Sequence, residues 1–246
     1  MTPKNHPRYE SLLLREKIKD AYKEGYLSDS GMIAHGRGET FDYLLGEKTT
    51  ESSRIAIDVS VAKLLLAENP VISINGNTTA LVIDEIIQLA KLIPAKIEIN
   101  LFYRNEKRID TIENILNKKG YDNVLGTNKD ELLYIKDIKN PRATASKNGI
   151  YSSDLILIPL EDGDRTEILV DSGKEVIAID LNPLSRTSKK ANITIVDNII
   201  RVIPLMIEIT KKFRSYNKEK LKDIIKDFSN KDNLKESLKC IDLNRI

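Results

Sequence analysis

The chain has 246 residues, of which 41% are hydrophobic and 31% charged, which is typical of a globular protein large enough to bury a sizeable core. Its 39 Lys and Arg residues nearly balance its 37 Asp and Glu residues, which argues against a general binder of nucleic acids or membranes. No stretch approaches the roughly 18 apolar residues that cross a bilayer, no signal peptide is recognised, and the only cysteine, Cys240, excludes an internal disulfide. We therefore expect a cytoplasmic protein.

Residues 7–69 are predicted to be mostly helical. Ile55, Val59, Ala62 and Leu66 recur at helical spacing, and the polar residues 50–53 before them offer oxygen atoms that can cap the helix. The preceding segment 31–39 contains three glycines, so we expect tight backbone turns between two helices there.

From residue 71 the pattern changes to short apolar runs that alternate with helical segments. We predict helices near 80–92, 106–119 and 166–172, an irregular insertion over 127–150, and helices from Asn198 almost to the end. The predicted strands are 71–74, 96–102, 155–158, 176–179 and 193–196.

This order of elements predicts an α/β fold, a Rossmann-like, mostly parallel sheet flanked by helices, with helical N-terminal and C-terminal segments. We expect one domain over 1–246, made of a helical part (1–69), an α/β core (70–200) and C-terminal helices (201–246).

Polar turns follow the predicted strands directly. In open α/β sheets, ligands bind beyond the carboxyl ends of the strands, so these turns should share one rim. Asn75, Asn77 and Thr78 stand where a strand ends and a helix begins, a place suited to an anion. An ordinary strand-to-helix turn would use the same residues.

The turn 161–165 carries three acids, and Asp162 and Asp164 are its candidate Mg²⁺ ligands because Mg²⁺ prefers oxygen. Repulsion between such acids requires a cation or an arginine among them. The alternative is a solvated acidic turn that caps the next helix.

Two arginines suit phosphate. Arg186 follows Asp180, which stands where an acid could bind a ribose, and Arg186 is flanked by Ser185, Thr187 and Ser188. Arg37 lies between two glycines and beside His35. That histidine is a candidate base or hydrogen-bond donor, although a packed histidine is the simpler interpretation.

Common nucleotide motifs are missing from the sequence. No G-x-G-x-x-G follows a predicted strand and no G-x-x-x-x-G-K-[ST] occurs, which disfavours a standard dinucleotide fold and a P-loop NTPase.

Long collinear strings resemble the archaeal phosphopantothenate synthetase family, also called 4-phosphopantoate–β-alanine ligases. The resemblance extends to about residue 215 and is weaker over 120–150. It is carried by HPRYESLLLREK (6–17), GMIAHGRGETFDYLLGEKT (31–49), AKLLLAENPVISINGN (62–77), EINLFYR (98–104), PLEDGDRTE (159–167), IDLNPLSR (179–186) and TIVDNI (194–199).

The resemblance implies a homodimeric ligase that joins 4-phosphopantoate and β-alanine, forms AMP and pyrophosphate from ATP with Mg²⁺, and acts in coenzyme A biosynthesis. The ATP contacts that it implies are Arg15, Arg37, Asp180, Leu181, Asn182, Arg186, Thr187, Asn198 and Ile199. With that function, Arg37, His35 and Arg186 become the candidate catalytic residues, and Asn75, Asn77 and Thr78 the candidate site for phosphopantoate.

Two other functions stay open at the level of the sequence. The alternating strands and helices also suit an NAD(P)-dependent oxidoreductase, although the glycine fingerprint is missing. A non-catalytic nucleotide-sensing module is the second, although a sensor needs neither a second anion site nor an acidic cluster on the same rim.

Overall fold

A computed structural model describes residues 3, 5–6, 8–138 and 140–241. The extreme ends of the predicted domain 1–246 lie outside these residues, and the division of that domain into three parts stays a prediction. Within the described residues, no helix is both long and apolar enough to span a membrane.

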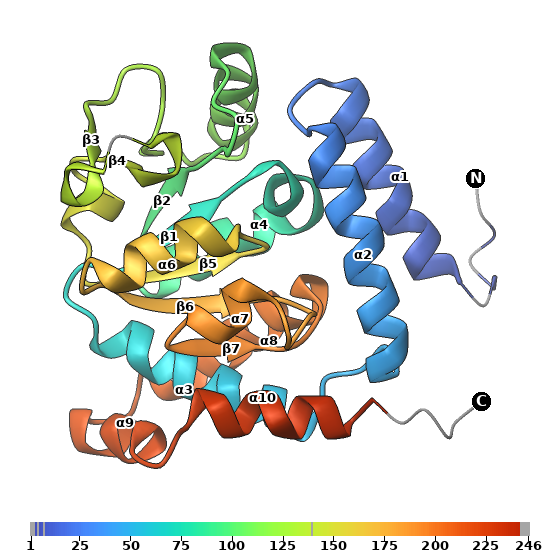
Figure 1. Cartoon of the computed structure of the whole chain (residues 1–246), viewed down its shortest axis with the longest axis vertical. Coiled ribbons are helices and arrows are strands. Elements are labelled where there is room, and N and C mark those ends of the chain that lie inside the picture. Colours follow the sequence, from blue (N-terminus) through green and yellow to red (C-terminus); the bar gives the residue numbers. More distant parts are fainter. Residues whose placement is uncertain (1–2, 4, 7, 139, 242–246) are drawn as a thin grey trace.

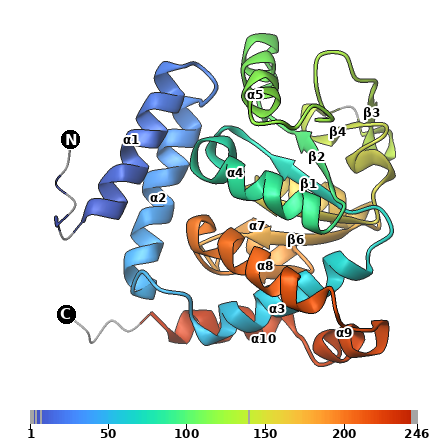
Figure 2. The same ribbon diagram turned by 180° about the vertical axis from the view of Figure 1, so that it is seen from behind.

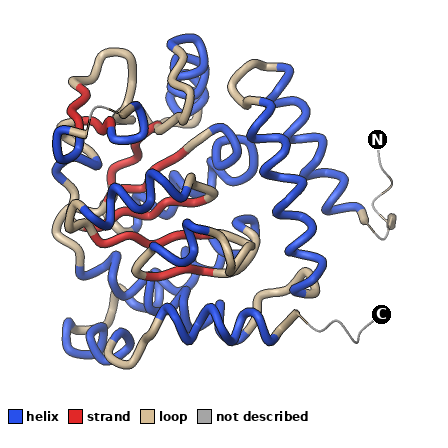
Figure 3. Tube along the Cα trace, viewed as in Figure 1, coloured by secondary structure: helices blue, strands red, loops and turns tan. Residues whose placement is uncertain are grey.

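The centre of the molecule is a parallel sheet in the order β2-β1-β5-β6-β7, which confirms the predicted fold class (Figure 3). Nearly every residue of its strands is buried, as expected for strands covered on both faces. The predicted strand 96–102 is too long, because β2 ends at Ile99, opposite the last residue of β1. The strands are β1 (Val71–Ile74), β2 (Lys96–Ile99), β5 (Leu155–Pro159), β6 (Glu175–Ile179) and β7 (Ile193–Ile195).

Helices cover both faces of this sheet (Figures 1 and 2). On one face lie α3 (Glu51–Leu66), α4 (Gly76–Leu92) and α8 (Ile199–Phe213), and on the other α6 (Gly163–Asp171) and α7 (Arg186–Lys190). Ile72 and Leu157 face the first layer, whereas Ile156 and Ile158 face the second, as the two-residue period of strands requires. The remaining helices are α5 (Glu106–Lys118), near β2, and α9 (Lys218–Ile225) and α10 (Asn230–Lys239) near the C-terminus.

The direction of the crossovers changes between β1 and β5. From β1 the chain passes through α4 to β2 at one edge, and from β5 it passes through α6 and α7 towards β7 at the other edge. The turns after β1 and β5 therefore diverge at a topological switch point, where open α/β sheets bind their ligands.

A helical hairpin of α1 (Tyr9–Lys23) and α2 (Asp29–Leu45) stands beside the carboxyl ends of the strands (Figure 1). The predicted turns at 31–39 are wrong, because the whole segment lies inside α2. At Gly31 the glycine serves close packing, since a Cβ atom there would lie 2.7 Å from the Asn77 Oδ1 atom on α4.

The insertion predicted over 127–150 is largely irregular, but it contains one antiparallel pair, β3 (Leu132–Tyr134) with β4 (Thr144–Ser146), and short 3-10 turns at Ile135–Asp137, Pro141–Ala143 and Ile150–Ser152.

Glu98 of β2, only 1% exposed, fixes this insertion to the sheet. Its carboxylate accepts hydrogen bonds from the backbone N–H groups of Ser146 (3.0 Å) and Ile150 (2.6 Å). Burial raises the pKa of Glu98, and these hydrogen bonds act in the opposite direction. A Cβ atom at Gly149 would lie 2.1 Å from the Glu98 Oε2 atom, so a side chain has no room there.

Candidate active site

A cleft of about 780 Å³ opens at the carboxyl ends of the strands, beneath α2. Its walls come from α2, the start of α4, the loop after β2, the insertion, the turns after β5 and β6, and the start of α8. The lining includes twelve of the predicted site residues: His35, Arg37, Asn75, Asn77, Asp162, Asp180, Leu181, Asn182, Arg186, Thr187, Asn198 and Ile199. Arg15, Thr78 and Asp164 lie outside the lining.

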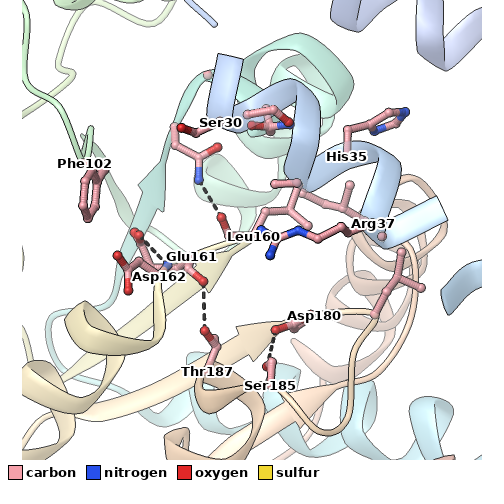
Figure 4. A pocket seen from close by; sticks show the side chains of 18 of the residues that line it. Ser30, His35, Arg37, Phe102, Leu160, Glu161, Asp162, Asp180, Ser185 and Thr187 are labelled. Atoms are coloured by element: carbon pink, nitrogen blue, oxygen red, sulfur yellow. Dashed lines mark hydrogen bonds between the residues drawn. The ribbon is translucent and has the colours of Figure 1, made fainter. Parts of the chain in front are cut away.

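Hydrogen bonds lock together the two turns at the switch point. The Asn75 side-chain amide donates to the carbonyl of Leu160 (3.0 Å), as Figure 4 shows, and its Oδ1 atom accepts from the Thr78 backbone (3.1 Å). Leu160 has a φ of +55°, which is rare outside glycine and frequent at functional sites. This conformation leads directly into Glu161, whose carboxylate lines the cleft.

The side chains expected to bind substrate are already engaged within the protein. The hydroxyl of Thr78, fully buried, bonds to Asn75, and the Asn77 amide donates to the carbonyl of Gly31 at 2.9 Å. Gly76 and Asn77 begin α4, and their backbone N–H groups have no acceptor among the described residues. The prediction of a substrate site at this turn stays a prediction, with backbone amides as its available donors.

The turn after β6 is held by its own polar groups. Asp180 accepts a hydrogen bond from the backbone of Asn182 (2.9 Å) and another from the hydroxyl of Ser185. Burial raises the pKa of Asp180. Leu181 packs with Leu45 of α2 and with Val196, which follows β7. The Thr187 hydroxyl donates to the carbonyl of Glu161 at 2.9 Å, which ties this turn to the one after β5 (Figure 4).

Asn198 connects this rim to α2. It caps α8, and its amide donates to buried Asp42 of α2 at 2.8 Å. Arg201, in the first turn of α8, forms ion pairs with both Asp42 (2.5 Å) and Asp197 (2.6 Å). Since Asn77 holds the start of α2 and this network holds its end, α2 is fixed at both ends across the cleft. Ile199 lies 1% exposed at the start of α8.

Arg37 projects from the middle of α2 into the cleft, towards Leu160 and Glu161 (Figure 4). It has neither an ion pair nor a side-chain hydrogen bond within the described part of the chain. An unpaired cation that lines a cleft is available to bind a ligand anion.

Arg15 lies on α1 and His35 on α2, and both Arg15 and Glu39 are close enough to His35 to influence its pKa. Arg15 forms an ion pair with Glu39 at 2.9 Å, and Glu39 itself lines the cleft. Burial lowers the pKa of His35, and its Nε2 atom is buried without a hydrogen-bond partner among the described residues. His35 is therefore neutral near pH 7, and a protonated catalytic acid is disfavoured.

The acids expected to bind Mg²⁺ are paired with arginines. Asp162 caps α6 and accepts a hydrogen bond from the Arg142 Nε atom at 2.9 Å. Asp164 forms ion pairs with Arg142, at 3.3 Å, and with Arg186. No group of three or more potential ligands gathers within the residues that the structure describes. These carboxylates therefore do not fit a metal site built by the protein alone, and the prediction of Asp162 and Asp164 as ligands stays untested.

Arg142, Arg108, Phe102 and Glu161 were not identified as site residues from the sequence, yet all line the cleft. Arg142 lies 4.1 Å from the ring centre of Phe102 and comes from the irregular insertion, which carried no signal. Arg108 could have been recognised from the sequence, because it stands in the first turn of α5, where the helix dipole disfavours a cation. Burial raises the pKa of Glu161, and Arg165, 3.8 Å away, opposes that shift.

Comparison with known proteins adds an independent line of argument. Residues 52–244 match the family model described as phosphopantothenate/pantothenate synthetase. A protein of Thermococcus kodakarensis named 4-phosphopantoate–beta-alanine ligase is 50% identical over 239 residues, which is 96% of this chain and 90% of that protein. A protein of the same name from Methanosarcina mazei is 50% identical over 236 residues, 96% of this chain and 92% of that one. Another from Methanospirillum hungatei is 49% identical over 203 residues, 82% of each.

Proposed function

The chain belongs to the phosphopantothenate/pantothenate synthetase family, and from that premise we propose that it is an ATP-dependent ligase of coenzyme A biosynthesis. It joins 4-phosphopantoate to β-alanine and releases AMP and pyrophosphate. One observation carries the proposal: a single cleft at the switch point has an unpaired cation, Arg37, over one rim and the free amides of α4 at the other. A ligase with two phosphorylated substrates requires two separate sites that bind phosphate groups.

The chemistry divides into two steps. A carboxylate is a poor electrophile, so an oxygen of the phosphopantoate carboxylate first attacks the α-phosphorus of ATP. The new C–O–P linkage forms while the bond to the β-phosphate breaks and pyrophosphate leaves. The amine of β-alanine then attacks the activated carbonyl carbon, a C–N bond forms, and AMP leaves.

We assign the nucleotide to the rim made by Asp180, Asn182 and Arg186, beneath Arg37, with Asn198 at its end. Arg37 would contact the phosphates, since it forms no ion pair with any acid of the described chain. Arg186 is 56% exposed and already faces Asp164 and Glu167, so it can turn towards a phosphate while these acids retain Arg142 and Lys190 as cationic neighbours.

Magnesium would enter as the partner of the ATP phosphates, since Mg²⁺ is usually held by substrate phosphates and waters with only one or two carboxylates. No step is assigned to it.

Glu161 supplies the base in this proposal. Its side chain is 11% exposed and lines the cleft between the two rims. The attacking amine must lose a proton, and a carboxylate at this place can hold the ammonium group of β-alanine and accept that proton. Its raised pKa makes it a better base than an ordinary glutamate.

We also propose that the chain forms a homodimer and works in the cytoplasm, where ATP and both substrates are supplied. The hairpin of α1 and α2 exposes several large apolar side chains, which suits an interface between two copies. They are Leu13 (45% exposed), Tyr22 (44%), Ile33 (63%), Tyr43 (43%) and Leu44 (41%). Light scattering that gives 27.9 kDa, the mass of one chain, at micromolar concentration would contradict the dimer.

The reaction is tested by isotope exchange. Purified protein should exchange labelled pyrophosphate into ATP when phosphopantoate is present and β-alanine is absent, because adenylation comes first. AMP should accumulate only when β-alanine is added. Formation of ADP and phosphate would instead show an acyl-phosphate route. Oxidation or reduction of NAD(P) by the protein would support the oxidoreductase, and ATP binding without AMP formation would support the sensor.

A further inference from the structure

Arg108 carries a positive charge that no acid of the described chain neutralises. It lies in the first turn of α5 and lines the cleft. Its Nε and Nη2 atoms donate to the carbonyl of Tyr26 (3.3 and 3.2 Å), and its Nη1 atom donates to the carbonyl of Tyr103 at 3.1 Å. Every partner is a neutral carbonyl.

This environment is unfavourable for a cation in the absence of a ligand. Burial lowers the pKa of Arg108. The dipole of α5 adds positive potential in its first turn. Each terminal nitrogen of the guanidinium has two N–H groups and uses one, so one donor on each remains available.

Arg108 also lies beside the start of α4. A Cβ atom at Gly76 would stand 2.7 Å from the carbonyl oxygen of Tyr26, which is the oxygen that Arg108 binds. The carbonyl of Tyr26 is thus a shared neighbour of Arg108 and Gly76, and Arg108, Gly76 and Asn77 line the same cleft. Arg142, the other arginine on this side of the cleft, is occupied by Asp162 and Asp164.

We infer that Arg108 binds the 4-phosphate of phosphopantoate, together with the amides of Gly76 and Asn77, and thereby selects the phosphorylated substrate over free pantoate. This inference rests on the proposed function. Two unpaired arginines then serve two phosphate groups, Arg37 for the nucleotide and Arg108 for the second substrate. Arg108 contacts no reacting atom, so its contribution is to affinity and specificity.

The test compares Arg108→Gln with Arg104→Gln. Arg104 is a suitable control because it also donates to neutral carbonyls, those of Gly126 and Thr127, and lies outside the cleft lining. In Arg108→Gln the KM for phosphopantoate should rise by about 10–100-fold, the loss expected for a charge-assisted contact. The KM for ATP should stay within about twofold, and Arg104→Gln should change neither.

Two further measurements separate binding from structure. Preference for phosphopantoate over pantoate, measured as the ratio of kcat/KM values at high enzyme concentration, should collapse in Arg108→Gln. Arg108→Lys keeps the charge and should recover part of the lost affinity. Equal losses for ATP and phosphopantoate, an unchanged preference, or the same loss in Arg104→Gln would overturn the inference. Wild-type protein that makes no AMP from ATP when phosphopantoate and β-alanine are both present would instead refute the proposed function itself.

Discussion

Replacement of Arg37 by glutamine tests the nucleotide rim most directly. Arg37 is exposed on α2 and makes no ion pair with any described residue, so the free energy of unfolding should change by no more than about 0.5 kcal/mol. If Arg37 binds the triphosphate, a charge-assisted contact of roughly 1.5–3 kcal/mol is lost. At about 1.4 kcal/mol for each factor of ten, ATP should bind about 10–100-fold more weakly.

The assay is calorimetric titration of ATP, with a thermal melt of the same sample. Arg54→Gln is a suitable control, because Arg54 is exposed on α3 and lies outside the cleft lining. Higher ionic strength should reduce the difference in ATP affinity between the wild type and Arg37→Gln, because the contact between Arg37 and the triphosphate is exposed to solvent. Unchanged ATP affinity with weaker binding of phosphopantoate would assign Arg37 to the other substrate. Unchanged affinities with a lower Tm would make Arg37 structural.

Three further changes test separate parts of the site. Arg201→Met removes the cation from two buried acids and should lower the free energy of unfolding by about 3–5 kcal/mol. Arg214→Met is the control, because Arg214 is exposed at the C-terminal cap of the same helix; equal melting temperatures of the two variants would contradict the reasoning. Arg186→Ala should weaken ATP binding about 10–100-fold without loss of the fold, because its ion pairs are exposed; a lower Tm with unchanged ATP affinity would refute it. The rate of amide formation should fall as the pH drops through the raised pKa of Glu161, since protonation removes the base. Glu161→Gln should remove this fall from the pH profile of amide formation, while the exchange of pyrophosphate into ATP persists. Loss of the pyrophosphate exchange as well would show that Glu161 acts before amide formation.

The sheet could be predicted from sequence because each buried strand is a short apolar run that ends in a turn. Val71–Ile74 matches β1 exactly. The error at 31–39 arose because glycine serves two purposes: it permits turns, and it permits close packing of helices. Only the tertiary position of Asn77 shows that Gly31 serves the second.

The site was less predictable than the fold. The turns after the strands were correctly expected to share one rim, because strand direction alone decides this. The sequence could not show which charged side chains lack an ion-pair partner, since the partners come from other segments of the chain. Arg142, 20 positions from its partner in the sequence, neutralises Asp162, whereas Arg37 and Arg108 have no such partner among the described residues.

The way in which Glu98 holds the insertion has an evolutionary consequence. The carboxylate binds the backbone N–H groups of Ser146 and Ile150, and otherwise excludes only a side chain at position 149. Any residue except proline supplies such an N–H group. This anchor therefore places no demand on the exposed side chains of the insertion, whereas Ile135, Ala143 and Ala145 are held by the core and Arg142 is the residue that reaches the cleft. Weak similarity over this segment is thus compatible with an unchanged role.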